Sequence, residues 1–555
     1  MAFAAAVGGV RSLATMKGPG ANVASDALLS AAYGGVNSAL VVLVADDPGP
    51  HTTQTEQDSR YYGFLANLPI LEPSTVQEAK DLLKAAVKIS EKYSLPVIYR
   101  TTTRVNHSSA NVKLGAIPAL PEARARIRPE PERFIRASMR WNLSRHKWVL
   151  SKLKELKEDP YVKNLVQLSS SESKLGIVCS GVSYVYVAEV LSKMGLRDSV
   201  DVLKLNLTYP IPERIMRRFF DEKEKVLVVE ELEPILELQI RSLLTLWNLD
   251  HCVDLLGKLD GTLPRYGEFH AKLVEKAVLK LLGRTVSEDE EAKAVEVPSR
   301  PPPFCAGCPH MASYYILLKA VSDLGYKKDE VPIIGDIGCY ALSFNPPLRA
   351  IWFEHCMGAS IGIAAGLKLA GFEKPVIATI GDSTFLHAGM PALVDVVHLQ
   401  LPVLVVILDN GTVAMTGHQP HPATDKRLSP GPVRKVDLLQ LVKGMGVDDV
   451  VKLDPYDVKS SVDVVKEKLA KLDHPTVVIF ERACAVVARR MGIKYGVARV
   501  NQERCTACNV CIRQLGCIAL ERLEDGKVRI NQGLCNGCGV CAQICPFKAI
   551  EVVKG

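Results

Sequence analysis

Apolar runs and amphipathic runs alternate along the first part of the chain. Residues 39–45 (ALVVLVA) are continuously apolar, as a strand buried on both faces requires. Residues 76–93 (VQEAKDLLKAAVKISEKY) repeat their apolar positions with the period of a helix, and 95–100 return to a strand-like run. This order predicts an α/β domain built on a parallel sheet.

The same alternation recurs twice further along and divides the chain. Segments rich in Pro, Arg or alternating charge separate the repeats and are typical of linkers. We expect a first α/β domain at 1–116, a linker and helix at 117–173, a second α/β domain at 174–285, a linker at 286–303, a third α/β domain at 304–492, and a cysteine-rich module at 496–555.

Composition narrows the class of protein. Hydrophobic residues make up 48% of the 555 residues and charged residues 23%, as in soluble globular proteins. The net charge is +7 without a long basic run, so we expect no nucleic-acid partner. No stretch of apolar residues is long enough to span a bilayer, and the N-terminus has no basic residues before its apolar start. We therefore predict a cytoplasmic protein without a membrane partner.

Eight of the 15 cysteines lie between Cys505 and Cys545, in a tandem repeat. Each half has the spacing C-x2-C-x2-C followed by a more distant cysteine. This spacing resembles two-cluster bacterial ferredoxins, in which the distant cysteine of one half ligates the cluster of the other half. The expected ligands are Cys505, Cys508, Cys511 and Cys545 for one [4Fe–4S] cluster, and Cys535, Cys538, Cys541 and Cys517 for the other.

The first half of this repeat departs from the bacterial pattern. Five residues separate Cys511 from Cys517, whereas three separate Cys541 from Cys545, and no proline follows Cys517. The difference predicts an altered local fold or potential for one cluster. Two zinc sites are the main alternative, since paired C-x2-C motifs also bind zinc. Disulfides would need an oxidising compartment, which the absence of an export signal argues against.

A turn in the third domain carries candidate metal-binding chemistry. Residues 376–380 predict a strand that ends in the turn Gly381–Ser383, and 403–408 predict the next strand, which ends before Asn410. Because the carboxyl ends of consecutive parallel strands meet at one edge of a sheet, we expect Asp382 and Asn410 to lie close together. A carboxylate and an amide oxygen suit Mg²⁺. The alternative is an ordinary βαβ unit in which Asp382 caps a helix.

Two glycine-rich segments upstream support a phosphate site. Residues 335–342 (GDIGCYAL) and 354–367 (EHCMGASIGIAAGL) predict turns that lead into helices, whose N–H groups can hold a diphosphate. With the GDS…DN spacing, they resemble the thiamine diphosphate motif of transketolase-like enzymes. That resemblance implies a metal held by Asp382, Asn410 and the backbone carbonyl of Thr412. The candidate cofactor-binding residues are Gly338, Cys339, Met357, Gly358, Gly381, Asp382, Ser383, Asn410 and Thr412.

Taken together, the chain resembles the alpha subunits of indolepyruvate:ferredoxin oxidoreductases, within the wider 2-oxoacid:ferredoxin oxidoreductase family. The resemblance extends over nearly the whole length. The segments that carry it are 41–65, 95–107, 304–310, 335–343, 356–362, 407–422 and the ferredoxin-like tail. The implied fold class is α/β, with transketolase-like parallel-sheet domains that bind thiamine diphosphate and a C-terminal α+β two-cluster ferredoxin domain.

The resemblance implies a reaction and partners. The cofactors are thiamine diphosphate, Mg²⁺ and two [4Fe–4S] clusters, and a 2-oxoacid, chiefly an aryl pyruvate such as indolepyruvate, is oxidatively decarboxylated to an acyl-coenzyme A. Iron–sulfur clusters accept electrons one at a time and pass them to external ferredoxin. The partner is a smaller beta subunit, in a hetero-oligomer that is expected to be a dimer of heterodimers.

Related subunits also hold a third, proximal [4Fe–4S] cluster. Cys305, Cys308, Cys339 and Cys484 follow the order of its ligands, with Cys356 as a competing ligand. The alternative is a structural or zinc-binding C-x2-C pair with two unrelated buried thiols. Cys179 and Cys252 have no expected role.

The remaining candidates are single residues. His310, His418 and His421 lie in motifs near the expected cofactor and are candidates for diphosphate contact or proton transfer, although each would more commonly be a structural histidine. Asp58 and Arg60 are weaker candidates for contact with substrate or coenzyme A.

Thiamine also needs a glutamate that activates its pyrimidine ring. In the family this residue precedes an Ala- and Gly-rich helix, and here the chain opens within that helix, so we expect the glutamate upstream of Met1. Either the start has been assigned too late, or the chain is a shortened paralogue.

Two other functions remain open. The chain could be a non-redox thiamine-dependent 2-oxoacid decarboxylase, against which the tail cysteines argue. It could also be an electron-transfer or scaffold subunit with a degenerate thiamine site.

Overall fold

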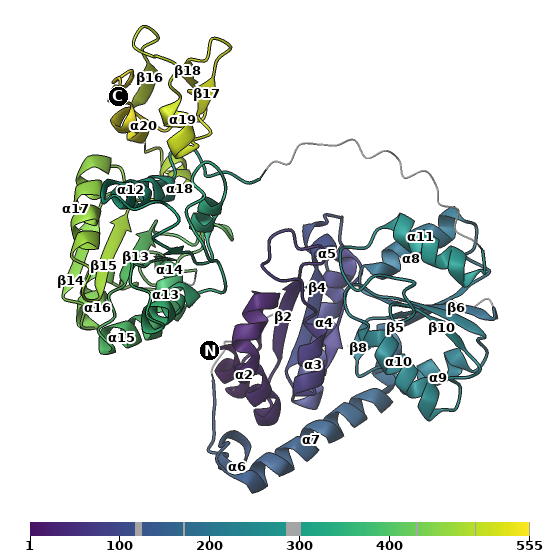
Figure 1. Ribbon diagram of the computed structural model, residues 1–555. Helices are drawn as coiled ribbons and strands as arrows, with labels where there is room; N and C mark the ends of the chain where they lie inside the picture. Colours follow the sequence, from purple (N-terminus) through teal and green to yellow (C-terminus); the bar gives the residue numbers. More distant parts are fainter. Residues whose placement is uncertain (117–124, 170–171, 285–300, 429–430, 494, 554–555) are drawn as a thin grey trace. The chain divides into compact units, whose positions relative to one another are not determined.

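The computed structural model describes residues 1–116, 125–169, 172–284, 301–428, 431–493 and 495–553. They fall into two units, residues 1–294 and 295–555 (Figure 1). Most of the linker predicted at 286–303 lies outside the described residues, as do residues 117–124 of the segment predicted at 117–173.

A five-stranded sheet forms the core of the N-terminal part, in the order β1-β2-β4-β3-β8. All neighbouring strands are parallel except β8, which runs antiparallel to β3. The strands are β1 (Ser12–Lys17), β2 (Leu40–Asp46), β3 (Ile70–Leu71), β4 (Val97–Thr102) and β8 (Leu207–Tyr209). The helices are α1 (Ala2–Val7), α2 (Gly18–Gly34), α3 (Arg60–Ala66), α4 (Val76–Tyr93) and α5 (Thr103–His107).

Helix α4 has the bounds that its periodicity predicts. It begins where the Thr75 side chain accepts the Glu78 N–H at 3.2 Å, and the Glu78 carboxylate accepts the Ser74 N–H at 2.8 Å. This reciprocal arrangement satisfies donors that the first turn of a helix leaves free. The apolar face of α4, including Leu82, packs on the sheet, so the prediction is confirmed.

A second five-stranded sheet follows, in the order β10-β9-β6-β7-β5. Its strands are β5 (Val166–Ser169), β6 (Leu175–Ser180), β7 (Asp201–Leu205), β9 (Lys225–Val229) and β10 (Asp254–Leu256). The helical segments are α6 (Pro131–Phe134), α7 (Met139–Glu158), η1 (Pro160–Leu165), α8 (Ser183–Lys193), α9 (Glu213–Phe220), α10 (Ile235–Leu246) and α11 (Ala271–Leu281). Strand β5 precedes the expected boundary at residue 174 and pairs antiparallel with β7. Strand β8 leaves this part of the chain and extends the first sheet, so the two α/β parts share a strand.

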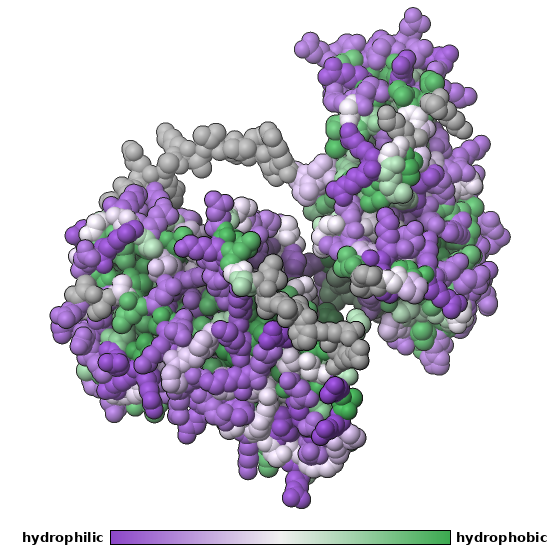
Figure 2. Space-filling model, turned by 180° about the vertical axis from the view of Figure 1, so that it is seen from behind, coloured by the Kyte–Doolittle hydropathy of each residue, from purple (hydrophilic) through white to green (hydrophobic). Residues whose placement is uncertain are grey.

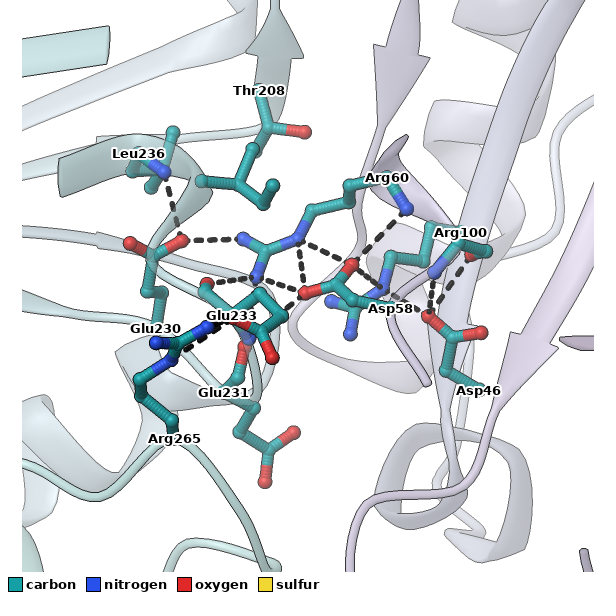
Figure 3. A network of polar contacts seen from close by, with 12 residues as sticks. Asp46, Asp58, Arg60, Arg100, Thr208, Glu230, Glu231, Glu233, Leu236 and Arg265 are labelled. Atoms are coloured by element: carbon teal, nitrogen blue, oxygen red, sulfur yellow. Dashed lines mark hydrogen bonds and ion pairs between the residues drawn. The ribbon is translucent and has the colours of Figure 1, made fainter. Parts of the chain in front are cut away.

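A buried network of charges joins these two parts (Figure 3). Arg60, at the start of α3, is 0% exposed and binds Asp58 through its Nη2 at 2.6 Å and Glu230 through its Nη1 at 2.6 Å. Its Nη2 also donates to the carbonyl of Glu231 at 2.8 Å. Arg100 binds Asp46 at 2.7 Å from β4 to the end of β2. Arg60 therefore links Asp58 of the first part to Glu230 and Glu231 of the second.

This network bears on the two weaker candidates for substrate contact. Asp58 and Arg60 are both buried, and each is bonded to groups of the protein. The pKa of Asp58 falls to about 2 because, although burial opposes ionisation, the Arg60 and Arg100 guanidinium groups outweigh it. These two residues join two domains in this structure.

The C-terminal unit contains a third sheet, in which all strands are parallel and ordered β11-β12-β13-β15-β14. The strands are β11 (Ile333–Ile334), β12 (Ile377–Gly381), β13 (Leu404–Asp409), β14 (Asp449–Leu453) and β15 (Thr476–Glu481). The helical segments are α12 (Pro309–Asp323), η2 (Cys339–Phe344), α13 (Ala359–Leu369), α14 (Asp382–Thr384), η3 (Phe385–Gly389), α15 (Met390–His398), α16 (Leu438–Gly444), α17 (Val458–Ala470) and α18 (Ala485–Arg490). Apolar clusters cover both faces of this sheet, as a parallel sheet requires.

The cysteine-rich module completes this unit. It has two two-stranded antiparallel sheets, β16 (Val497–Val500) with β19 (Ile550–Val553) and β17 (Leu520–Arg522) with β18 (Val528–Ile530). Two short helices, α19 (Val510–Leu515) and α20 (Val540–Ile544), occupy equivalent places in the two halves of the repeat. Helix α19 packs on α12, and α20 packs on α17.

The helices that the structure describes include none long and apolar enough to cross a lipid bilayer. On the face shown in Figure 2, apolar side chains are interspersed among hydrophilic ones.

Replacing Arg60 with Met tests the charge network. The substitution leaves the Asp58 and Glu230 carboxylates buried without their cation, so we expect a loss of about 3–5 kcal/mol in the free energy of unfolding. The matched control is Arg265→Met, since the Arg265 side chain is 55% exposed where it pairs with Glu233. That change should cost no more than about 1 kcal/mol. Urea denaturation followed by circular dichroism measures both, and equal losses would contradict the assignment.

Candidate functional site

The carboxyl ends of β12 and β13 bring Asp382 and Asn410 together. Gly381 pairs with Leu408 in the parallel register, so the two chain segments leave the sheet side by side. The Asp382 Oδ2 accepts the N–H of Asn410 at 3.2 Å and that of Gly411 at 3.0 Å. The adjacency expected from the sequence is therefore present in the structure.

The oxygens of this edge are fixed by local hydrogen bonds. The Ser383 N–H donates to Asp382 Oδ1 at 2.7 Å, and the Thr412 N–H donates to Asn410 Oδ1 at 3.0 Å. Asp382, Asn410 and Thr412 are 4%, 8% and 6% exposed. The three expected metal ligands therefore lie together in a buried turn, with oxygen atoms as the available donors.

Two histidines contact these residues. His310, in the first turn of α12, lies with its Nε2 at 2.9 Å from Asn410 Nδ2. Because an amide nitrogen only donates, His310 Nε2 is the acceptor. Burial lowers the pKa of His310 to about 4, so the ring is neutral near pH 7. His310 therefore orients the Asn410 side chain, with its amide oxygen turned away.

His421 approaches the carboxylate of Asp382. Its Nε2 lies 3.1 Å from Asp382 Oδ2, and its Nδ1 accepts the Ala423 N–H at 3.3 Å. His421 Nδ1 is thus an acceptor, and Nε2 faces Asp382 without meeting the geometry of a hydrogen bond. His418 does not share this position: it lies at positive φ (65°), and burial and then Arg490 lower its pKa.

Asp409 is a second carboxylate beside Asp382, and the sequence analysis did not single it out. Burial, and then the charge of Asp382, raise the pKa of Asp409 to about 7. Burial opposes ionisation of Asp382, but the His421 contact and the bonded N–H groups outweigh it and lower the Asp382 pKa. The Asp382 carboxyl is buried, that of Asp409 is partly buried, and His421 contacts Asp382, so a divalent cation would stabilise the pair further. The sequence could have indicated Asp409, because it stands directly before the expected metal ligand Asn410.

Asp336 is a further residue that the sequence analysis missed. Its carboxylate accepts the Gly358 N–H at 3.0 Å and the Ser360 N–H at 3.2 Å, and so caps helix α13. The N–H groups of Gly358 and Ser360, at the helix start that was expected to hold a diphosphate, are thus bonded to the Asp336 side chain. The sequence predicted a helix after the turn at Gly338, and the structure has the 3-10 helix η2 there. A Gly-Asp pair after a strand, as at Gly381, was the signal for Asp336.

The remaining candidate cofactor contacts differ in exposure. Gly358 and Gly381 are buried, Gly338, Cys339 and Ser383 are partly buried, and Met357 is 53% exposed. Gly358 has φ +90° at the start of α13 and would place a Cβ 2.6 Å from that of Ala388, so only glycine fits there. These residues border the turn that holds Asp382.

Four cysteines lie near one another beside this edge. Burial raises the pKa of Cys305, Cys308 and Cys339, and thiols of the same group, including Cys484, raise it further. The Cys484 N–H donates to the Asn410 carbonyl at 3.0 Å, so Cys484 is bonded to the turn that contains Asn410. The dispersed cysteines expected for a third cluster are therefore gathered here.

The competing cysteine and the two unassigned ones lie outside this group. Cys356 and Cys252 are exposed, and Cys179 is fully buried in the second sheet. None of these three is among the thiols that shift the pKa of the gathered group.

The cysteines of the C-terminal module line two cavities in the crossed arrangement expected from the repeat. One cavity is lined by Cys517, Cys535, Cys538 and Cys541. A second is lined by Cys505, Cys508, Cys511 and Cys545. Across the described residues, no three His, Cys, Asp or Glu side chains converge closely enough to hold a single metal ion. The thiols surround larger spaces instead.

Four family models match consecutive parts of the chain. They are the thiamine diphosphate-binding domain of pyruvate flavodoxin/ferredoxin oxidoreductases (1–142), the indolepyruvate ferredoxin oxidoreductase middle domain (164–274), the C-terminal TPP-binding domain of thiamine pyrophosphate enzymes (336–480) and a 4Fe-4S binding domain (528–551).

Curated relatives match over the full length. The chain is 38% identical to the indolepyruvate oxidoreductase subunit IorA of Pyrococcus horikoshii, over 100% of this chain and 88% of the relative. It is 39% identical to the IorA subunit of Archaeoglobus fulgidus, with the same coverage. The 2-oxoglutarate synthase subunit KorB of Archaeoglobus fulgidus is 26% identical over 28% of this chain and 59% of the relative.

Solved structures are more distant. A 2-oxoglutarate:ferredoxin oxidoreductase from Magnetococcus marinus is 19% identical with a TM-score of 0.31, over 34% of this chain and 65% of that chain. A putative thiamin diphosphate-dependent enzyme from Mycobacterium smegmatis is 14% identical with a TM-score of 0.26, over 87% of this chain and 89% of that chain.

The paired carboxyl groups predict a pH dependence of stability in the metal-free chain. Folded Asp409 keeps its proton up to about pH 7, whereas the unfolded chain releases it near 3.8. The folded state therefore binds more protons between these values, and stability falls as pH rises through this window. We expect the difference between wild type and Asp409→Asn to decline by on the order of 1 kcal/mol per pH unit.

Denaturation with urea and a chelator, from pH 4 to pH 8, measures this difference. Asp382 does not interfere, because its lowered pKa acts only below the window. Asp395→Asn is the matched control, since Asp395 is exposed on α15, and its difference from wild type should stay flat. A flat curve for Asp409→Asn as well would contradict the shared burial of the two carboxyl groups.

Proposed function

The chain belongs to the family of indolepyruvate oxidoreductase IorA subunits, and on this premise we propose that it oxidatively decarboxylates aryl pyruvates, chiefly indolepyruvate, to aryl-acetyl-coenzyme A. The protein is a subunit of a 2-oxoacid:ferredoxin oxidoreductase with a thiamine pyrophosphate-binding domain and a 4Fe-4S domain. The proposal rests on one arrangement. The C-terminal unit contains a buried oxygen site, a group of four cysteines and two cysteine-lined cavities.

We assign Asp382, Asn410 and the Thr412 carbonyl to Mg²⁺. The donor set fits, because hard oxygen ligands suit this ion and a cation would offset the charge of the Asp382–Asp409 pair. His310 orients the Asn410 amide, whose oxygen accepts the Thr412 N–H and keeps a second lone pair for the metal, and His421 contacts Asp382. Bound thiamine diphosphate would supply the carbanion chemistry of decarboxylation.

We assign Cys305, Cys308, Cys339 and Cys484 to a third [4Fe–4S] cluster. Burial raises the pKa of the Cys305, Cys308 and Cys339 thiols, so ligation would require these three to lose protons as the cluster binds. The bond from Cys484 to the Asn410 carbonyl supports a position close to the metal edge. A cluster there would accept electrons one at a time from the thiamine site.

The tail would hold two further clusters in the crossed arrangement of the sequence prediction. The apolar linings of the two cavities, which include Leu520 and Val528, suit [4Fe–4S] clusters, and the matched 4Fe-4S domain favours them over zinc. External ferredoxin would then take the electrons. We propose a smaller beta subunit as the partner chain, by analogy with the named subunits of the relatives.

Activity of the assembled complex tests this proposal. The protein, isolated without oxygen together with its smaller subunit, should reduce a low-potential viologen dye only when indolepyruvate and coenzyme A are both present. Asp382→Asn should lower this rate by about 100-fold or more, since it weakens a hard-cation ligand. Decarboxylation that needs neither coenzyme A nor an electron acceptor would favour a non-redox enzyme instead, and a fully inactive complex would favour the scaffold alternative.

Iron content tests the third cluster separately. Three [4Fe–4S] clusters give about twelve irons per chain, and Cys484→Ser should lose about four of them. Cys356→Ser is the matched control, because Cys356 is exposed and lies outside the gathered group, and it should keep its iron. About eight irons in the wild type would contradict the assignment of the third cluster.

A further inference from the structure

The two halves of the ferredoxin-like repeat differ where the module meets the thiamine-binding domain. Five residues separate Cys511 from Cys517, two more than in the second half. In the structure this longer segment completes α19 and ends in Gly516 at φ +68°. Leu515, within it, is 1% exposed and belongs to the apolar cluster of the preceding domain. The longer segment thus contains Leu515, which is buried against the neighbouring domain.

Gly516 makes a close approach at this junction. A Cβ at this position would lie 2.4 Å from Cδ of Pro347, which belongs to the thiamine-binding domain. Only a residue without a side chain allows the two segments to touch here. The chain then continues directly into Cys517, which lines the same cavity as Cys535.

Cys517 faces the loop of the C-x2-C motif. Gly307 and Cys517 line the same cavity, and burial, opposed by the N–H groups of Gly307 and Ala519, raises the pKa of Cys517. Gly307 has φ +67°, and a Cβ there would fall 2.1 Å from Asn536 Oδ1, next to Cys535. The loop between Cys305 and Cys308 is therefore one wall of the Cys517 cavity.

Tyr456 fixes this loop from the opposite side. Its phenol donates a hydrogen bond to the Gly307 carbonyl, and the side chain is 6% exposed. The Gln543 side chain on α20 donates to the Tyr456 carbonyl at 2.7 Å and accepts the Val458 N–H at 3.0 Å. The ring of Tyr495 packs edge-on against Tyr456, with centroids 5.4 Å apart. Tyr456 is therefore held by both domains.

We propose that residues 512–517 are a docking element and Tyr456 a positioning residue, which together hold the Gly307 N–H against Cys517 and make the Cys305 group and the Cys517 cavity consecutive electron sites. The inference rests on the proposed function, since it requires clusters at both places. Hydrogen bonds to ligand sulfur raise the reduction potential of an iron–sulfur cluster. The contact would thus make the Cys517 cluster the acceptor for the proximal one and leave the Cys505 cavity as the exit.

Gly516→Ala opens the junction without touching a ligand, and the full complex with its clusters is the material for the test. We expect iron content to stay at the wild-type level, while the spin–spin interaction between neighbouring reduced clusters in the EPR spectrum is lost. Electron transfer to the tail clusters in a single turnover should slow by about tenfold or more. The matched control is Gly526→Ala, which has a similar positive φ (+83°) but no atom closer than 3.5 Å to the added Cβ.

Tyr456→Phe keeps the ring and removes the hydrogen bond to the loop. We expect a lower reduction potential for the Cys517 cluster in an EPR redox titration, with unchanged iron. Tyr99→Phe removes an equally buried phenol from the N-terminal unit, where it donates to Ala79 at 2.7 Å, and should leave all potentials unchanged.

The outcomes separate this inference from the function beneath it. Wild-type protein without the iron of the Cys305 group would overturn the proposed third cluster, whereas the activity of the complex decides the proposed function. If that iron is present but Gly516→Ala and Tyr456→Phe leave the coupling and the potentials as in the wild type, the docking inference alone is wrong.

Discussion

The parallel register of β12, β13 and β15 is the constraint on which the C-terminal unit depends. It brings three turns to one edge of the sheet, and backbone hydrogen bonds then connect them. The Arg482 N–H donates to the Asp409 carbonyl, and the Cys484 N–H donates to the Asn410 carbonyl, both at 3.0 Å. A shift of one strand by one residue would turn every side chain to the other face of the sheet. The proposed metal ligands and one proposed cluster ligand are therefore positioned by the same sheet.

Burial of charge is the cost of this arrangement, and the two units meet it differently. In the N-terminal unit, Arg60 and Arg100 pair with the buried carboxylates of Asp58 and Asp46, although Asp46 Oδ1 and Arg100 Nη2 have no hydrogen-bond partner (Figure 3). At the edge of the third sheet, Asp382 has a histidine and backbone N–H groups, and Asp409 retains a proton. The first arrangement is a structural junction, whereas a cation would stabilise the second further. The same residue type thus has different roles because of what surrounds it.

Sequence reasoning succeeded where local pattern determines structure. The periodicity of residues 76–93 gives α4, and alternating apolar runs give the strands that end at Asp382 and Asn410. It failed where a partner lies far away in the chain. The segment around Arg60 is polar and was interpreted as a contact for substrate, but its cation is bound by Glu230, 170 residues later. Asp336 was missed because its role depends on helix α13 folding back over it. The contact of Arg60 with Glu230 has no local signal, and the Gly335-Asp336 pair marks the residue but not the helix that it caps.

The asymmetry of the ferredoxin-like repeat shows how a departure from a pattern can be informative. Considered in the sequence alone, the two additional residues before Cys517 indicated only an altered cluster environment. In the structure, the same segment buries Leu515 in another domain and places Gly516 against Pro347. Both helices of the module pack on the enzyme domain, α19 on α12 and α20 on α17, and both Leu515 and Val540 belong to its apolar cluster. The half whose distant cysteine borders the Gly307 loop is the one that has been lengthened, and this half also places Gly516 against Pro347.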